Sequence, residues 1–288
     1  MKIAVLPNLT RKKARYHTGR LIRKFGELGA KVLMLGKYRE DFGGTGVEFR
    51  DDFRKMLSDC DLMAAVGGDG TIIHCARYAA DADKPLLGVN VGRLGFVAEL
   101  ETDEFDRLDR LVRGDYQVER RMMLEVRYRE NGALRTCSAL NDAVLSRDSV
   151  SPMPDFRVEF GGLTVCDYRG DGLIAATPTG STAYSLSAGG PIIDPQLSCI
   201  LLSPICPHSL LTRPVVFGPD AELTVQACFP PGNEVFLIMD GEISVRISDP
   251  GEKVEFRRSG KTVKIVRLKD HNFYEIVNQK LGGGRNEA

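Results

Sequence analysis

The chain has 288 residues, of which 43% are hydrophobic and 27% are charged, and its 39 basic side chains balance 39 acidic ones. This length predicts one large or two medium domains with a sizeable core, and the balanced charge gives no electrostatic case for a nucleic-acid or acidic-membrane partner. No apolar run approaches the ~18 residues of a membrane helix. The apolar N-terminal stretch breaks at Pro7 and is too short for a signal peptide.

The seven cysteines are an odd number at irregular spacings, and the chain has no C-x-x-C motif. Such a pattern argues against a disulfide framework and against a zinc site. Reduced cysteines in a cytoplasmic protein fit the sequence better, and we expect that localisation.

Strand-like and helix-like segments alternate over the N-terminal third of the chain. Strands are expected at 3–6, 32–35, 62–66 and 86–89, and helices at 10–28, 49–57 and 72–80. This order predicts a parallel sheet with helices on its faces. Ligands of such sheets bind at the carboxyl ends of the strands.

The motif Gly67-Gly68-Asp69-Gly70-Thr71 lies between an expected strand and an expected helix. Glycines there let backbone N–H groups approach an anion, and the helix N-terminus favours negative charge, so we predict phosphate binding by Gly67, Gly68, Gly70 and Thr71. Asp69 would repel a phosphate unless it takes a proton from an attacking hydroxyl or helps to hold a divalent metal. The motif therefore indicates phosphoryl transfer to an alcohol. The alternative is a plain turn in which Asp69 only caps the helix.

The pattern changes near residue 118, where apolar and polar residues begin to alternate. We predict an α/β domain with a parallel sheet at 1–116, on which a tail of residues 270–288 packs, and a β-rich, antiparallel, sandwich-like domain at 117–269. A helix at 104–113 is expected to join them. In the second domain, strands are expected at 124–128, 156–160, 223–228, 235–239, 243–247 and 262–266, with turns at Asn131-Gly132 and Ser259-Gly260.

A second polar segment, residues 177–187, follows Asp171-Gly172 and a short apolar strand. Its hydroxyls, backbone N–H groups and one tyrosine suit recognition of ribose and amide groups, with a ring for stacking. The alternative is a Ser/Thr-rich loop with a helix cap, which is the simpler interpretation of Thr177 and Ser185.

Two shorter polar pairs stand in the β-rich half. Asn141-Asp142 interrupts an apolar run, so it either marks a strand end or reaches into a site. Asp240-Gly241 follows a strongly apolar strand, and a hairpin turn explains it at least as well as ligand contact does.

Taken together, these motifs resemble the NAD kinases, which phosphorylate the adenosine ribose 2′-hydroxyl of NAD to make NADP. The glycine motif alone resembles lipid kinases and phosphofructokinases equally, whereas Thr177–Tyr184 is far more specific. The matching pieces, in the family's order, are Gly67–Thr71, residues 90–96, Asn141-Asp142, Asp171 with Thr177–Tyr184, Pro207–Leu210 with Arg213-Pro214, and Asp240-Gly241. The resemblance implies an α/β domain followed by a β-rich domain, with a site between them.

The resemblance also implies roles for individual residues. Asp69 is expected to be the general base for the ribose hydroxyl, Gly70 to contact the nucleotide through its backbone, and Phe96 to lie against a base. Asn141 and Asp142 are expected at the ribose or adenine. The family often has glutamate at the second of these positions, and Asp142 is one methylene shorter.

Further NAD-binding residues follow from the second segment. Asp171 and Tyr184 are expected on the nicotinamide side of the pocket. Arg169 is near enough to reach a phosphate, as is His74, for which a packed or solvent-facing histidine is an equal alternative. The remaining expected contacts are Thr182, Ala183, Ser185, Leu186 and Ser187.

The implied substrates are NAD and either ATP or polyphosphate, without a nucleic-acid or membrane partner. Mg²⁺ or another divalent cation is expected through the nucleotide phosphates, with no protein ligand assigned, and the chain is expected to form a homo-oligomer, a dimer or tetramer. One alternative is a kinase of the same superfamily that acts on a lipid or a sugar. Another is a non-catalytic sensor of NAD or NADP, which would have no need of Asp69 beside a phosphate.

Overall fold

The computed structural model describes residues 1–92, 95–269 and 273–281. Internal contacts divide the chain into two compact units: unit 1 is Met1–Arg120 with the chain from Val263 onward, and unit 2 is Arg121–Thr262. The predicted domain limits, 1–116 and 117–269, stay predictions. Within the predicted tail 270–288, residues 270–272 and 282–288 lie outside the described residues, and the remainder is helix α7 (Phe273–Leu281).

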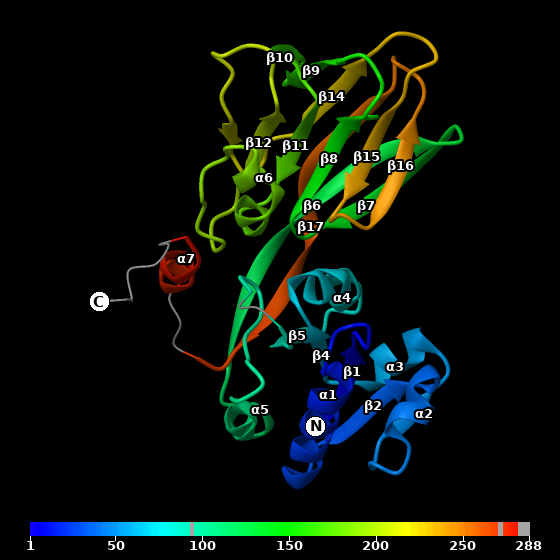
Figure 1. The fold of residues 1–288 in the computed structure, drawn as a ribbon, viewed down its shortest axis with the longest axis vertical. Coiled ribbons are helices and arrows are strands. Elements are labelled where there is room, and N and C mark those ends of the chain that lie inside the picture. The colour runs from blue at the N-terminus through cyan, green and yellow to red at the C-terminus, as the bar shows by residue number, and fades with distance from the viewer. Residues whose placement is uncertain (93–94, 270–272, 282–288) are drawn as a thin grey trace. The chain divides into compact units, whose positions relative to one another are not determined.

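Unit 1 is built on a parallel sheet with the order β17-β5-β4-β1-β2-β3 (Figure 1). Val5 pairs with Ala64, and Ala64 pairs with Leu87, so the carboxyl ends of β1, β4 and β5 meet at one edge. The strands are β1 (Lys2–Pro7), β2 (Lys31–Leu35), β3 (Glu48–Arg50), β4 (Leu62–Gly67), β5 (Pro85–Asn90) and the end of β17 (Lys253–Arg267). The predicted parallel α/β arrangement is confirmed.

Helices cover both faces of this sheet. Leu21 and Phe25 of α1 are buried in one cluster with Leu108 of α5, while α3 and α4 contact β1, β2, β4 and β5. The helices are α1 (Ala14–Glu27), α2 (Arg39–Phe42), α3 (Phe53–Asp59), α4 (Asp69–Asp81) and α5 (Leu108–Arg113), with 3-10 turns at Gly36–Tyr38 and Phe105–Arg107.

One helix prediction in unit 1 is wrong. Phe49 does not continue the helical run of Phe53 but lies in β3, where it pairs with Met34 of β2. The side chain of Asp52 accepts a hydrogen bond from the N–H of Lys55 and so caps α3, which begins at Phe53. The helical spacing of Phe49 was therefore accidental.

Unit 2 contains two antiparallel sheets with the orders β10-β9-β14-β17-β6-β7 and β13-β12-β11-β8-β15-β16. The first comprises β6 (Gln117–Glu130), β7 (Ala133–Ala139), β9 (Asp155–Phe160), β10 (Leu163–Arg169), β14 (Leu223–Cys228) and β17. The second comprises β8 (Asp142–Arg147), β11 (Gly172–Ala176), β12 (Ile200–Ile205), β13 (Val215–Phe217), β15 (Val235–Met239) and β16 (Ile243–Ile247), and the 3-10 turn η3 (Thr179–Thr182) and short helix α6 (Tyr184–Ser187) follow β11.

Of the two turns predicted in unit 2, one is confirmed and the other is wrong. Asn131 and Gly132 both have positive φ, as a type I′ hairpin turn requires, and join β6 to β7. Ser259-Gly260, by contrast, is not a turn, since β17 runs through it without a break. Pairing with β14 before this point and with β5 after it keeps the backbone extended.

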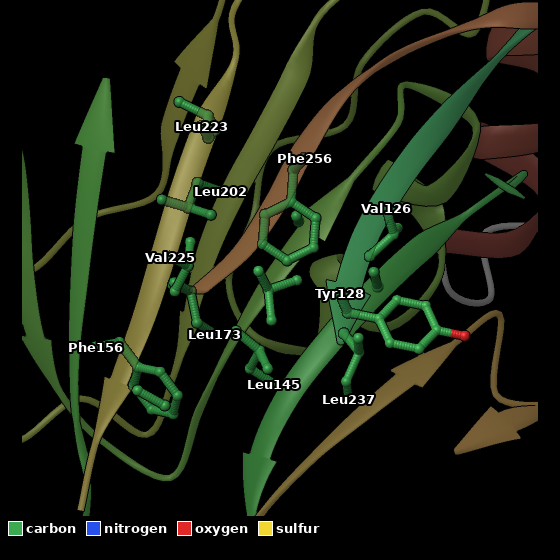
Figure 2. Close-up of a cluster of buried hydrophobic side chains, with 14 of the residues drawn as sticks. Val126, Tyr128, Leu145, Phe156, Leu173, Leu202, Leu223, Val225, Leu237 and Phe256 are labelled. Atoms are coloured by element: carbon green, nitrogen blue, oxygen red, sulfur yellow. The ribbon is translucent and has the colours of Figure 1, made fainter. Parts of the chain in front are cut away.

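The core of unit 2 lies between its two sheets. Phe156 and Phe256 of one sheet pack in the same cluster as Leu145, Leu173 and Leu237 of the other (Figure 2). The alternate residues of β8, β11 and β12 are also buried, in a second cluster that includes Ile193 from the segment after α6. The central strands β8, β11 and β12 are therefore apolar on both faces. In the described part of the chain, no helix is long and apolar enough to cross a membrane.

Candidate functional site

The glycine motif lies at the edge where β1, β4 and β5 end. Gly67 closes the buried strand β4, Gly68 caps α4, and the N–H of Thr71 donates to Gly68 O at 2.9 Å. The Thr71 side chain occupies the place of any Cβ on residue 67, so this position requires glycine. Asn8, just after β1, donates to Thr71 Oγ1 at 3.1 Å and ties the two strand ends together.

Asp69 is the first residue of α4 and is held from the opposite side by the chain after β5. Its Oδ2 accepts from the N–H of Phe96 at 2.7 Å, and its Oδ1 accepts from the N–H of Val97 at 3.3 Å. A Cβ on Gly95 would overlap the carboxylate, so this close approach depends on glycine. Each oxygen has two lone pairs, and one on each remains available to a substrate donor.

A cavity of about 840 Å³ opens beside this carboxylate. Its volume falls within the range of small-molecule sites. Glu101, at the wall, has a pKa raised by burial, which outweighs the hydrogen bonds that Asn90 donates to it. The lining residues are Arg11, Lys12, Lys13, His17, Gly68, Asp69, Gly70, Asn90, Val91, Gly92, Gly95, Glu101 and Thr102.

The sequence interpretation missed the basic side of this cavity. Arg11, Lys12, Lys13 and His17 lie after β1 and at the start of α1. A signal was present, because a run of three cations follows a strand whose end belongs to the predicted ligand edge of the sheet.

Two other predicted residues of unit 1 are not in the cavity lining. The exposed ring of His74 packs edge-on against Tyr78, with centroids 5.3 Å apart, which favours the packed-histidine alternative. Phe96 is half-buried, and Lys280 Nζ of α7 lies 3.9 Å from its ring centroid. The role of each toward NAD stays a prediction. In residues 90–96, Arg93 and Leu94 are outside the described part of the chain.

In unit 2, Asp240 organises the predicted pair Asn141-Asp142. Its carboxylate accepts from the backbone N–H groups of Leu140 at 2.8 Å, Asn141 at 2.7 Å and Asp142 at 3.2 Å. Its own N–H donates to Asp142 O at 2.9 Å. Asp240 and Gly241 have positive φ and form the hairpin turn between β15 and β16, so the turn interpretation is confirmed and the carboxylate has a separate structural task.

The second polar segment meets the same backbone from the other side. Thr177 Oγ1 donates to Leu140 O at 2.6 Å, and the N–H of Thr177 donates to Asn141 O at 2.8 Å. The N–H of Gly180 donates to Thr177 Oγ1 at 3.1 Å, and Asn141 O occupies the place of any Cβ on Gly180. Thr177 is fully buried, so its hydroxyl is structural.

Asp142 is a buried carboxyl, 6% exposed, at the start of β8. Burial first, and then the nearby charge of Asp240, raise its pKa to about 7, against the opposing hydrogen bond from the N–H of Tyr184. Burial also raises the pKa of Asp240, and the three backbone donors oppose that rise. Asp142 is therefore poised to gain or lose a proton near neutral pH.

The structure places Tyr184 beside Asp142 but separates both from Asp171. Asp171 precedes β11 and ion-pairs with Arg147 at 2.7 Å, whereas Thr177 follows the five residues of this strand. An extended strand of that length spans roughly 17 Å. Exposed Arg169 lies at the Asp171 end as well. Whether Asp171 and Tyr184 contact the same nucleotide stays a prediction.

The other predicted contacts of residues 182–187 differ in accessibility. Tyr184 is 47% exposed and Ser187 is exposed, so both are accessible to a ligand. Ser185 is fully buried, and its hydroxyl is 2.8 Å from that of Ser203. Thr182, Ala183 and Leu186 are half-buried. Contacts of all these residues with NAD stay predictions.

Comparisons with known proteins identify relatives over nearly the whole chain. The family model described as the ATP-NAD kinase N-terminal domain matches residues 11–116, and the ATP-NAD kinase C-terminal domain matches residues 140–268. An NAD kinase of Symbiobacterium thermophilum is 44% identical over 227 residues, 78% of this chain and 80% of the relative. An NAD kinase of Prosthecochloris aestuarii is 36% identical over 284 residues, 98% of this chain and 96% of the relative.

Solved structures share the fold. Yeast NADH kinase complexed with NADH has a TM-score of 0.90, with 22% identity, over 100% of this chain and 89% of that chain. An NAD kinase from Archaeoglobus fulgidus in complex with ATP has a TM-score of 0.75, with 26% identity, over 98% of this chain and 99% of that chain.

Proposed function

Because the chain belongs to the NAD kinase family and is an NAD kinase, we propose that it transfers the terminal phosphoryl group of ATP to the 2′-hydroxyl of the adenosine ribose of NAD, with Asp69 as the general base. The observation that carries this proposal is the Asp69 carboxylate, which two backbone N–H groups hold at the wall of a cavity lined by cations. The Archaeoglobus fulgidus relative binds ATP, which supports ATP as the donor.

The proposed step moves one proton and one phosphoryl group. The ribose hydroxyl gives its proton to Asp69 as its oxygen bonds to the terminal phosphorus of ATP. The bond from that phosphorus to the bridging oxygen breaks, and ADP leaves. The fixed carboxylate orients the hydroxyl for this attack, and a general base is typically worth about 10²–10⁴-fold in rate.

Mg²⁺ is proposed as a companion of ATP. Among the residues that the structure describes, no group of three or more His, Cys, Asp or Glu side chains could hold a metal ion. We propose that Mg²⁺ arrives on the triphosphate. A cytoplasmic location and a homo-oligomeric state are likewise proposed.

Asp69→Asn tests the assigned base. We expect kcat to fall by about 10²–10⁴-fold, measured as NADP formed from NAD and ATP, while equilibrium binding of NAD is retained. Asp81→Asn, at the far end of the same helix, is the matched control and should keep wild-type turnover. Near wild-type turnover of Asp69→Asn with intact NAD binding would refute the role of Asp69. Parallel assays with polyphosphate instead of ATP identify the donor.

A further inference from the structure

Three consecutive cations, Arg11, Lys12 and Lys13, form one wall of the cavity beside Asp69. All three are exposed, and none makes an ion pair with any residue in the described part of the chain. Many other surface cations are paired, as Arg15 is with Asp41 and Lys24 is with Asp106. This wall therefore carries three cations that have no ion-pair partner among the described residues, and it faces a cavity that Asp69 and Glu101 also line.

This basic turn, residues 11–13, is fixed against the glycine motif. Asn8 donates to Thr71 Oγ1 and accepts from the hydroxyl of Thr10 at 2.6 Å. The N–H of Arg11 donates to Asn8 O at 3.3 Å. A Cβ on Gly68 would lie only 3.3 Å from Arg11 Nη2, so the guanidinium is beside the residue that precedes Asp69.

Lys13 adds backbone strain at the same place. It has φ 66° and ψ 1°, the left-handed conformation that non-glycine residues seldom adopt, and it precedes the first residue of α1. Such strain costs on the order of 1–3 kcal/mol and clusters at ligand-binding sites. The N–H of Ala14, the first residue of α1, donates to Arg11 O at 3.1 Å and so closes this turn.

We propose that the basic turn binds the phosphates of the phosphoryl donor, with Arg11 on the phosphoryl group that is transferred. This inference rests on the proposed function, because it assigns the donor to the β1–α1 side of the cavity. Arg11 suits the transferred group because a guanidinium donates two hydrogen bonds in a fixed geometry, whereas Lys12 and Lys13 act as point charges on the rest of the phosphate chain. His17 lines the same wall.

Kinetics of charge-removing variants test this assignment. Hydrogen bonds to charged groups contribute about 1.5–3 kcal/mol, which corresponds to about 10–150-fold in affinity. We expect Arg11→Gln to raise KM for ATP by at least about tenfold and to leave KM for NAD within about twofold. The triple variant R11Q/K12Q/K13Q should have a larger effect, and Arg11→Lys should restore part of the loss. Arg23→Gln, an exposed cation on α1 outside the cavity, is the matched control.

Measuring the binding of inorganic tripolyphosphate distinguishes the loss of phosphate contacts from a loss of folding in the variants. Calorimetry without NAD should show binding to the wild type that weakens with salt, and at least about tenfold weaker binding to R11Q/K12Q/K13Q at an unchanged melting temperature. Unchanged tripolyphosphate affinity and KM for ATP in the triple variant would overturn the inference while the proposed function stands. A raised KM for NAD with ATP unaffected would also overturn it. If the wild type made no NADP from ATP, the proposed function would fall, and tripolyphosphate binding alone would decide the inference.

Discussion

The raised pKa of the buried Asp142 carboxyl predicts how the stability of the protein depends on pH. Asp142→Asn keeps the size of the side chain and an oxygen that accepts from the N–H of Tyr184, but it removes the ionisable group. We expect this variant to be more stable than the wild type at alkaline pH in the absence of NAD. The expected gain comes from removing a buried negative charge that lies near Asp240.

The magnitude follows from the pKa of Asp142. Its pKa rises from the ordinary 3.8 to about 7 in the folded protein. Because the folded pKa is raised, the folded state holds its proton more tightly, so this stabilisation is complete below pH 3.8 and is lost as the pH rises to about 7. At about 1.36 kcal/mol per pKa unit, the total loss is about 4 kcal/mol, of which about 2–3 kcal/mol falls between pH 5 and pH 8.

Urea denaturation of the ligand-free protein at pH 5 and pH 8 measures this difference. The free energy of unfolding of the wild type should fall by about 2–3 kcal/mol more than that of Asp142→Asn between the two pH values. Asp106→Asn, whose carboxylate is 96% exposed, is the control and should follow the wild type. Equal pH dependence of Asp142→Asn and the wild type would refute the argument that Asp142 is a buried carboxyl with a raised pKa.

Three glycines give further predictions. Gly95→Ala should displace the carboxylate of Asp69 and lower kcat at least about tenfold in the NADP assay, and an unchanged kcat would mean that the carboxylate need not be held there. Gly180→Ala should destabilise unit 2 by about 1–3 kcal/mol, because the new Cβ meets Asn141 O, and a wild-type melting temperature would contradict that contact. Gly19→Ala, inside α1 with nothing near the added Cβ, should instead stabilise the protein by about 0.5–1 kcal/mol, and a lower melting temperature would disprove it.

Local sequence patterns correctly predicted those strands, turns and helices that form from residues close together in the chain. The apolar run, the glycines and the helical period around Asp69 predicted the strand, the turn and helix α4, because each of these forms within a few residues. The strands 223–228, 235–239 and 243–247 match their predicted limits for the same reason. Phe49 shows where this reasoning fails, since pairing with β2 overrode a helical spacing.

Contacts between distant segments could not be predicted from local patterns. The carboxylate of Asp240 caps the backbone of Leu140 across 100 positions of sequence, and nothing near either residue signals the other. The contact of the Lys280 ammonium with the ring of Phe96 also joins segments that are far apart in the sequence. The positions of Asp171 and Thr177 at opposite ends of β11 follow from the length of that strand, which motif matching ignores. For the basic turn, the position after β1 could be predicted from the sequence. That its side chains line the cavity beside Asp69 could not.

The hairpin turn at Asp240 also affects the predicted site, so the two interpretations of Asp240-Gly241 do not exclude each other. The hairpin turn has positive φ at Asp240 and Gly241, and aspartate tolerates this conformation better than most residues. The turn then directs the carboxylate to three backbone N–H groups of residues 140–142, which fixes the start of β8 and places Asp142 beside Tyr184. The same carboxylate helps to raise the pKa of Asp142. One turn residue thus sets both the position and the pKa of Asp142, which is predicted to contact NAD.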